Sequence, residues 1–182
     1  MSNFTVPTRN EVSENNQAIF DNLQKGLGFV PNLYAYFAKN ETALGDYLAL
    51  QNRKSTLKAK EREVINLVTS QINNCLYCQS AHSVIGKMNG FSEEEIIELR
   101  KGTASFDAKL DALVKFAASV VENKGKATVV AKEAFFQAGY NEANMIDVVL
   151  VIGDKIISNY IHNLTGFAID FPIATPIEKE LV

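Results

Sequence analysis

The chain has 182 residues, of which 47% are hydrophobic and 21% charged, a composition typical of a soluble globular protein of one domain. Its net charge of −3 at pH 7, with no basic patch or arm, gives no electrostatic reason to expect nucleic acid as a partner. No apolar run approaches the roughly 20 residues of a membrane span, and the polar first residues lack the apolar core of a secretory signal. We therefore expect a single cytoplasmic domain over residues 1–182.

Helical periodicity dominates the chain, and no segment alternates convincingly as a strand does. The clearest case lies in residues 57–72, where Val64, Leu67 and Val68 recur at helical spacing. Glycine, proline and asparagine separate the periodic segments. The sequence therefore predicts an all-α fold. We expect helices over residues 11–25, 33–52 (as one or two helices), 57–72, 76–89, 93–101, 107–122, 127–138 and 142–164, followed by an extended tail.

Two of the expected helix starts resemble each other. Residues 90–93 (GFSE) and residues 139–142 (GYNE) both follow one expected helix and open another. Such a match has two interpretations, two related helical hairpins or two generic helix starts with similar caps. Both interpretations stay open at the level of the sequence.

The strongest functional signal lies in residues 70–82, SQINNCLYCQSAH, which hold both cysteines and one of the two histidines. Cys75 and Cys78 are three apart, close enough to bridge, and His82 follows Cys78 by four, which is one helical turn. The asparagines at 73–74 are poor helix formers and good caps, so we expect a helix to begin here within a helical hairpin. Two thiols beside a base are the parts of a thiol redox site.

A structural disulfide is a poor explanation for this pair. The chain has no secretory signal, so a reducing compartment is the default, and lone cysteine pairs there are reactive or metal-binding more often than structural. Closing so short a loop would also remove little chain entropy.

The position of the two cysteines makes them chemically unequal. Thiolate is the reactive form, and the first turn of a helix favours negative charge through its unpaired N–H groups and dipole. His82 can take a proton from Cys78 or stabilise its thiolate, whereas Cys75 has no such partner by spacing. We therefore expect Cys78 to attack an oxidant and form a sulfenic acid, and Cys75 to resolve it to a disulfide. An external dithiol would reverse the disulfide.

Glu63 is the expected partner of His82. A hairpin that turns near residue 74 places residues 63–66 beside roughly 82–85, within reach of His82 but far from the thiols. The carboxylate would then orient and charge the imidazole, as the third member of a nucleophile, base and orienter set.

These residues carry a family resemblance. Glu63, twelve positions before the CLYC segment at 75–78, and His82 after three more intervening residues resemble the motif of the alkylhydroperoxidase AhpD-like proteins. That group belongs to the wider carboxymuconolactone decarboxylase family. Residues 28–48 are similar to the segment before the motif in peroxidase-related members, and residues 158–172 to their C-terminal helix and tail.

The resemblance implies an AhpD-like all-helical fold with the motif region at 57–90, oligomeric assembly and peroxide reduction through the two cysteines. By this analogy Cys78 is peroxidatic, Cys75 resolving, and Glu63 and His82 form a proton relay. Tyr77 stands where the best-known members have a second histidine, and we include it as a candidate proton donor. A phenol is a far weaker base near neutral pH, which predicts slow peroxidase turnover or another substrate.

Other interpretations of the same residues remain. In these, the cysteines serve only as small packing residues, Glu63 as part of a solvated helix face, and Tyr77 as a packing aromatic. A zinc site would use Cys75, Cys78 and His82, with His162 as a fourth ligand, although no second CxxC or histidine pair completes the usual set.

The sequence as a whole predicts an all-α thiol oxidoreductase that reduces a hydroperoxide and needs no bound cofactor, because the thiols carry the electrons. The expected partners are a thioredoxin-like or lipoyl-bearing reductant and further copies of the chain in a homo-oligomer, with no nucleic acid and no membrane. Two alternative functions are a carboxymuconolactone decarboxylase-type lyase and a non-catalytic thiol redox sensor.

Overall fold

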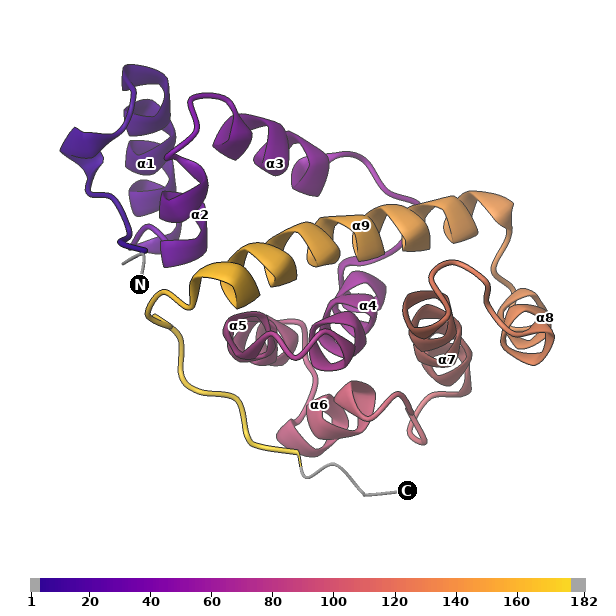
Figure 1. Ribbon diagram of the computed structural model, residues 1–182. Helices are drawn as coiled ribbons and strands as arrows, with labels where there is room; N and C mark the ends of the chain where they lie inside the picture. Colours follow the sequence, from indigo (N-terminus) through magenta and orange to yellow (C-terminus); the bar gives the residue numbers. More distant parts are fainter. Residues whose placement is uncertain (1–3, 178–182) are drawn as a thin grey trace. The chain divides into compact units, whose positions relative to one another are not determined.

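The computed structural model of the chain describes residues 4–177, and every regular element within that range is a helix (Figure 1). The all-α fold predicted from the sequence is confirmed. Within the same range, no helix combines the length and the apolar character needed to cross a membrane. The elements are a 3-10 helix, η1 (Arg9–Glu11), and the α-helices α1 (Glu14–Leu27), α2 (Asn32–Phe37), α3 (Ala43–Asn52), α4 (Ala59–Ile72), α5 (Leu76–Met88), α6 (Glu93–Arg100), α7 (Ala108–Glu122), α8 (Val129–Gln137) and α9 (Glu142–Thr165).

The predicted helices all exist, and the differences lie at their ends. The first helix begins three residues later than predicted because Ser13 is its N-cap, with a side chain that accepts the Asn16 N–H. It ends at Gly28, whose φ of 83° is a left-handed conformation that glycine adopts without strain. The segment 33–52 forms two helices, α2 and α3, and the short helix η1 was not predicted.

The chain forms two compact units. Unit 1 comprises residues 1–54 and 161–170, and unit 2 comprises residues 55–160 and 171–182, so α9 contributes to both. The expectation that one domain covers all 182 residues stays a prediction.

Unit 1 is built on a small apolar core from η1, α1, α2 and α3. Phe20 and Leu44 are buried in it, and the rings of Phe37 and Tyr47 stack with centroids 4.5 Å apart. Asn16 is also buried, and its side-chain amide donates to the carbonyls of Ala38 and Asn40, both at 3.1 Å. This amide satisfies two backbone carbonyls of the α2–α3 connection inside the unit.

Unit 2 has α4 at its centre. Figure 1 shows α4 beside α5 and α7, and α4 also packs on α6. The first part of α9, up to Tyr160, lies across α4 and α5 in the same unit. Because helices cover α4 on several sides, all residues of α4 from 63 to 70 are buried, polar ones included.

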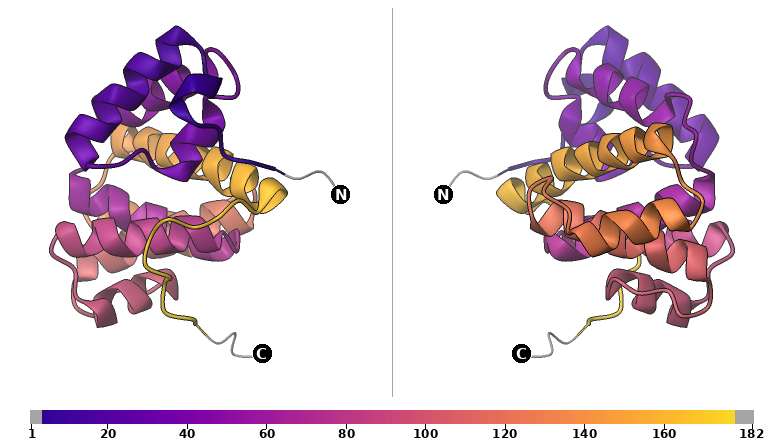
Figure 2. Two further views of the ribbon diagram at one scale, coloured as in Figure 1. Left: turned by 90° about the vertical axis from the view of Figure 1, so that its left-hand side faces the viewer. Right: turned by 90° about the vertical axis from the view of Figure 1, so that its right-hand side faces the viewer.

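From residue 171 to 177 the tail of unit 2 is extended, as the sequence predicted, and it passes over α5 toward α6 (Figure 2). Residues 178–182 of the predicted tail lie outside the described residues. The Ala174 N–H donates to the Ser80 hydroxyl at 3.0 Å, and Arg100 donates to the Thr175 carbonyl at 2.8 Å. The Phe171 ring packs edge-on against Tyr77. These contacts tie residues 171–175 to α5 and α6.

The two similar helix starts have the same local geometry. Gly90 and Gly139 both adopt left-handed φ angles, 87° and 88°, which end the preceding helical segments. Ser92 caps α6 in a capping box, and Asn141 exchanges reciprocal hydrogen bonds with Asn144 at the start of α9. Similar caps account for this likeness as well as a duplication would, so both interpretations remain.

Phe135 and Phe136 on α8 form a matched pair for testing the core of unit 2. Phe135 is 0% exposed, with ring centroids of Phe116 and Tyr140 at 4.4 and 4.5 Å, whereas Phe136 is 37% exposed. We expect Phe135→Ala to lower the free energy of unfolding by about 3–5 kcal/mol because it leaves a cavity between stacked rings. Phe136→Ala should cost about 1 kcal/mol or less. Chemical denaturation of both variants checks this, and equal losses would contradict the described packing.

Candidate active site

The α4–α5 turn brings both cysteines to the start of a helix. α4 ends at Asn73, and Asn74 has a φ of 52°, a left-handed conformation that asparagine tolerates better than most residues. The Cys75 N–H then donates to the Ser70 carbonyl at 3.0 Å, and Cys75 becomes the N-cap of α5. The helix break predicted at these asparagines is the turn that positions the thiols.

The two thiols are free, buried and in direct contact. Cys75 and Cys78 are 0% and 2% exposed. Cys75 donates to Cys78 across 2.7 Å between the two sulfurs, and Cys75 Sγ in turn accepts the Cys78 N–H at 3.3 Å. A disulfide bond is about 2.05 Å long, so only a small movement separates this pair from a bridge.

The same contact makes the thiols differ in acidity. The hydrogen bond from Cys75, together with the positive charge of Lys155, the nearby His82 and a hydrogen bond from Asn159, lowers the pKa of Cys78 to about 6 against the opposing effect of burial. The hydrogen bond to Cys78 and burial raise the pKa of Cys75 well above its ordinary value. Since one proton is held between two sulfurs, the pair ionises first at Cys78.

His82 and Glu63 are in contact, as expected from a helical hairpin that turns near residue 74. His82 Nδ1 is 2.8 Å from Glu63 Oε2, and the Asn66 amide donates to Glu63 Oε1, also at 2.8 Å. Burial alone would raise the pKa of Glu63, but the nearby His82 with its hydrogen bond, the amide of Asn66 and the charge of Lys155 together lower it. Glu63 is thus held as a carboxylate. A catalytic role for either residue stays a prediction.

Two site residues come from α9 and were missed in the sequence. Lys155 is 3% exposed, and its Nζ lies 3.0 Å from His82 Nε2. Asn159 is fully buried, donates to the Ser70 hydroxyl at 3.4 Å and hydrogen-bonds the Cys78 side chain. Both residues share a helical face with the core residues Val148 and Ile152. A lysine at a core position of an amphipathic helix is unusual enough to mark it as a candidate, but the sequence does not say which residues it contacts.

Tyr77 is buried under the tail of unit 2. It is almost fully inaccessible, and its ring centroid is 5.6 Å from that of Phe171 in an edge-on arrangement. This packing agrees with the alternative interpretation of Tyr77 as a packing aromatic. Its role as a proton donor stays a prediction.

The zinc alternative finds no support in the part of the chain that the structure describes. Within residues 4–177, no group of three or more His, Cys, Asp or Glu side chains is arranged to hold a metal ion. His162, the suggested fourth ligand, lies in unit 1, where its Nε2 is 3.1 Å from the Phe167 carbonyl oxygen.

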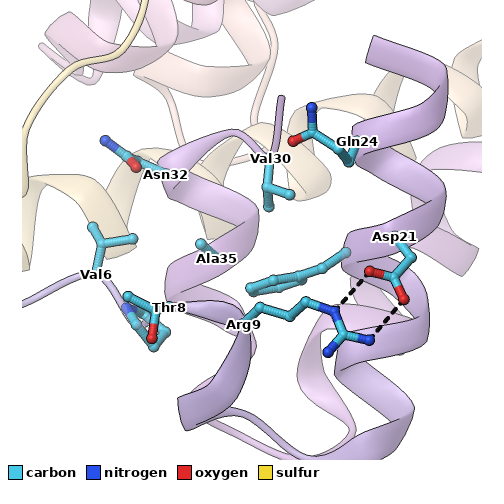
Figure 3. A pocket seen from close by; sticks show the side chains of 10 residues that line it. Val6, Thr8, Arg9, Asp21, Gln24, Val30, Asn32 and Ala35 are labelled. Atoms are coloured by element: carbon cyan, nitrogen blue, oxygen red, sulfur yellow. Dashed lines mark hydrogen bonds and ion pairs between the residues drawn. The ribbon is translucent and has the colours of Figure 1, made fainter. Parts of the chain in front are cut away.

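A cavity in unit 1 offers none of this chemistry. Its volume is about 260 Å³, and Figure 3 shows Arg9 and Asp21 joined at its edge by two hydrogen bonds, of 2.7 and 2.8 Å. Val30, Ala35 and Phe20 supply apolar walls. No cysteine or histidine lines it, so we assign the candidate active site to the thiol cluster of unit 2.

Comparison with known proteins agrees with this fold and motif. The sequence model of the carboxymuconolactone decarboxylase family matches residues 36–119, which include the Glu63, Cys75, Cys78 and His82 positions. No curated protein sequence matches the chain.

Solved structures resemble the chain over nearly its whole length. An uncharacterized peroxidase-related protein from Silicibacter sp. TM1040 is 25% identical, with a TM-score of 0.80 over 92% of this chain and 90% of that one. An alkylhydroperoxidase AhpD core structure, an uncharacterized peroxidase-related protein from Ralstonia eutropha JMP134, is 22% identical, with a TM-score of 0.83 over 92% of each chain. A variant of the debrominase Bmp8, in complex with 2,3,4-tribromopyrrole, is 16% identical, with a TM-score of 0.76 over 93% of this chain and 92% of that one.

The fold and the thiol cluster together define the class, an all-α protein of AhpD-like fold with a CxxC pair at the start of a helix. Residues 36–119 also match the sequence model of the carboxymuconolactone decarboxylase family. The resemblance noted in the sequence is thereby confirmed.

The unequal acidity of the thiols predicts selective alkylation. Because thiolate is the reactive form, the rate of Cys78 modification by iodoacetamide should rise as the pH increases through about 6 and then level off. Cys75 should stay unmodified over the same range, since its pKa is raised. Peptide mapping of the reduced protein after short exposures measures both rates. A midpoint near the free-thiol value of about 8.5 for both cysteines would contradict the described contact.

Proposed function

We propose that the protein is a thiol-dependent peroxidase that reduces hydroperoxides through the Cys78–Cys75 pair. The observation that carries this proposal is the direct contact of the two sulfurs at 2.7 Å, in which one thiol donates to the other and lowers the pKa of Cys78. A nucleophilic sulfur with its resolving partner already in contact suits a two-step oxidation.

In the first step the Cys78 thiolate attacks one oxygen of the hydroperoxide. A sulfur–oxygen bond forms, the oxygen–oxygen bond breaks, and the alcohol leaves after taking up one proton. Cys78 becomes a sulfenic acid, so the sulfur is oxidised by two electrons and the peroxide is reduced by two. His82, held by Glu63 at 2.8 Å, is the group placed to relay that proton.

In the second step Cys75 resolves the sulfenic acid. Its sulfur attacks Cys78 Sγ, the sulfur–sulfur bond forms, and water leaves with the Cys75 proton. The disulfide then needs two electrons and two protons from an external dithiol. We assign that role to a thioredoxin-like or lipoyl-bearing protein in the cytoplasm, and the active form to a homo-oligomer.

A lyase reaction of the carboxymuconolactone decarboxylase type is the second candidate, favoured by the family model that residues 36–119 match. Such chemistry would depend on His82 or another base rather than on thiol oxidation. It should therefore survive replacement of both cysteines by serine. The structural likeness to a debrominase shows that this fold is also found with a different named activity.

Peroxide consumption with a generic dithiol tests the proposal. The wild-type protein should turn over repeatedly, and the Cys75→Ser/Cys78→Ser double variant should not exceed the uncatalysed rate. A sulfenic acid trap should label Cys78 in the Cys75→Ser protein. Trapping at Cys75 in Cys78→Ser, with none in the reciprocal variant, would reverse the assigned roles. A single oxidation without repeated turnover, whichever dithiol is supplied, would instead identify a redox sensor.

The two histidines provide a matched test of the base. His82→Gln should slow peroxide reduction by about 100-fold, the usual scale of a lost acid–base group, and raise the pKa of Cys78. His162→Gln serves as the control because His162 contacts Phe167 in unit 1 and has no place in the proposed mechanism. Equal effects of the two variants on the rate–pH profile would remove the base role of His82.

A further inference from the structure

Lys155 is a buried cation that the proposed mechanism does not use. It is 3% exposed, and a charged lysine is rarely this buried without specific partners. Its Nζ lies 3.0 Å from His82 Nε2 and 3.6 Å from Asp154 Oδ2. A lysine so placed acts on the ionisation of the groups around it.

The contact between Lys155 Nζ and His82 Nε2 has room for one proton between the two nitrogens. A lysine ammonium has donors and no acceptor, so an ammonium at 3.0 Å requires His82 Nε2 to be the unprotonated, accepting nitrogen. If the imidazole were instead charged, Nε2 would carry a proton, and only a neutral amine could accept it. The pair therefore carries one positive charge, on one residue or the other.

The stronger base takes that proton. An amine is a stronger base than an imidazole, so the charge is placed on Lys155. His82 is then neutral and carries its single proton on Nδ1, where Glu63 Oε2 accepts it at 2.8 Å. Both contacts of His82 fit this one tautomer.

The surrounding ionisable groups agree with a cation at Lys155. Glu63 comes from α4, Cys75 and Cys78 from the start of α5, and Asp154 from α9 itself. The positive charge of Lys155 lowers the pKa of Cys78 and also favours ionised Glu63. One buried ammonium thus acts electrostatically on a carboxylate and on a thiolate.

We infer that Lys155, rather than a His82 imidazolium, is the counter-charge of the Cys78 thiolate, and that it holds His82 as the neutral tautomer with the proton on Nδ1. Lys155 is in this sense a positioning residue. The inference deepens the proposed function and rests on it only where turnover is concerned, because thiol ionisation and the histidine tautomer are measured without any peroxide.

The first test is the pKa of Cys78, measured as the pH dependence of its alkylation. Lys155→Met removes the charge and keeps much of the bulk, and it should raise this pKa by about one unit or more. Lys155→Arg keeps the charge and should restore most of the difference. Lys132→Met, at an exposed position of α8, is the control and should match the wild type. A Cys78 pKa that is the same in Lys155→Met as in Lys132→Met would overturn the inference.

The second test needs no change at Lys155 and so does not depend on the folding of a buried variant. In the ¹⁵N-labelled, reduced His162→Gln protein, the remaining histidine signal belongs to His82. Near neutral pH we expect a neutral ring with protonated Nδ1 and bare Nε2. A doubly protonated imidazolium, or a neutral ring with the proton on Nε2, would overturn the inference. Peroxidase turnover that fails while both tests succeed would reject the proposed function alone.

Discussion

The arrangement of the site depends on one buried chain of hydrogen bonds, from Glu63 through His82 to Lys155. A charge in a protein interior is stable only when it is paired, so these side chains constrain one another's positions. Because Glu63 lies on α4, His82 on α5 and Lys155 on α9, these hydrogen bonds join three helices of unit 2 around the thiols. Removal of one member would leave another charge without compensation, which makes the three residues a single electrostatic unit.

The difference between the cysteines follows from backbone geometry as much as from charge. The left-handed Asn74 ends the α4 connection and allows Cys75 to become the N-cap of α5. Its sulfur then accepts the Cys78 N–H, while its own proton points toward Cys78. The helix start and the buried cation act on the same sulfur, so both favour the thiolate at Cys78. The acidity of Cys78 therefore has a local source and a tertiary source.

The local source was readable in the sequence, and the tertiary source was not. The Asn73-Asn74 break, the Cys75–Cys78 spacing and the one-turn separation of His82 all concern neighbouring residues, for which helical geometry is known in advance. Even the approach of Glu63 followed from a hairpin of adjacent helices. Lys155 lies 73 positions after His82, and its approach depends on how α9 packs across α4 and α5. The edge-on packing of Phe171 on Tyr77 has the same tertiary origin.

The chemistry of the site depends most directly on one thiolate per chain, at Cys78, in the reduced protein near neutral pH. Ultraviolet absorbance of the thiolate, titrated from acid to neutral pH and calibrated against the double serine variant, counts it directly. The account predicts one thiolate per chain that appears as the pH rises through about 6, with no second one until strongly alkaline pH. Two thiolates that appear together above pH 8, or none at neutral pH, would contradict it.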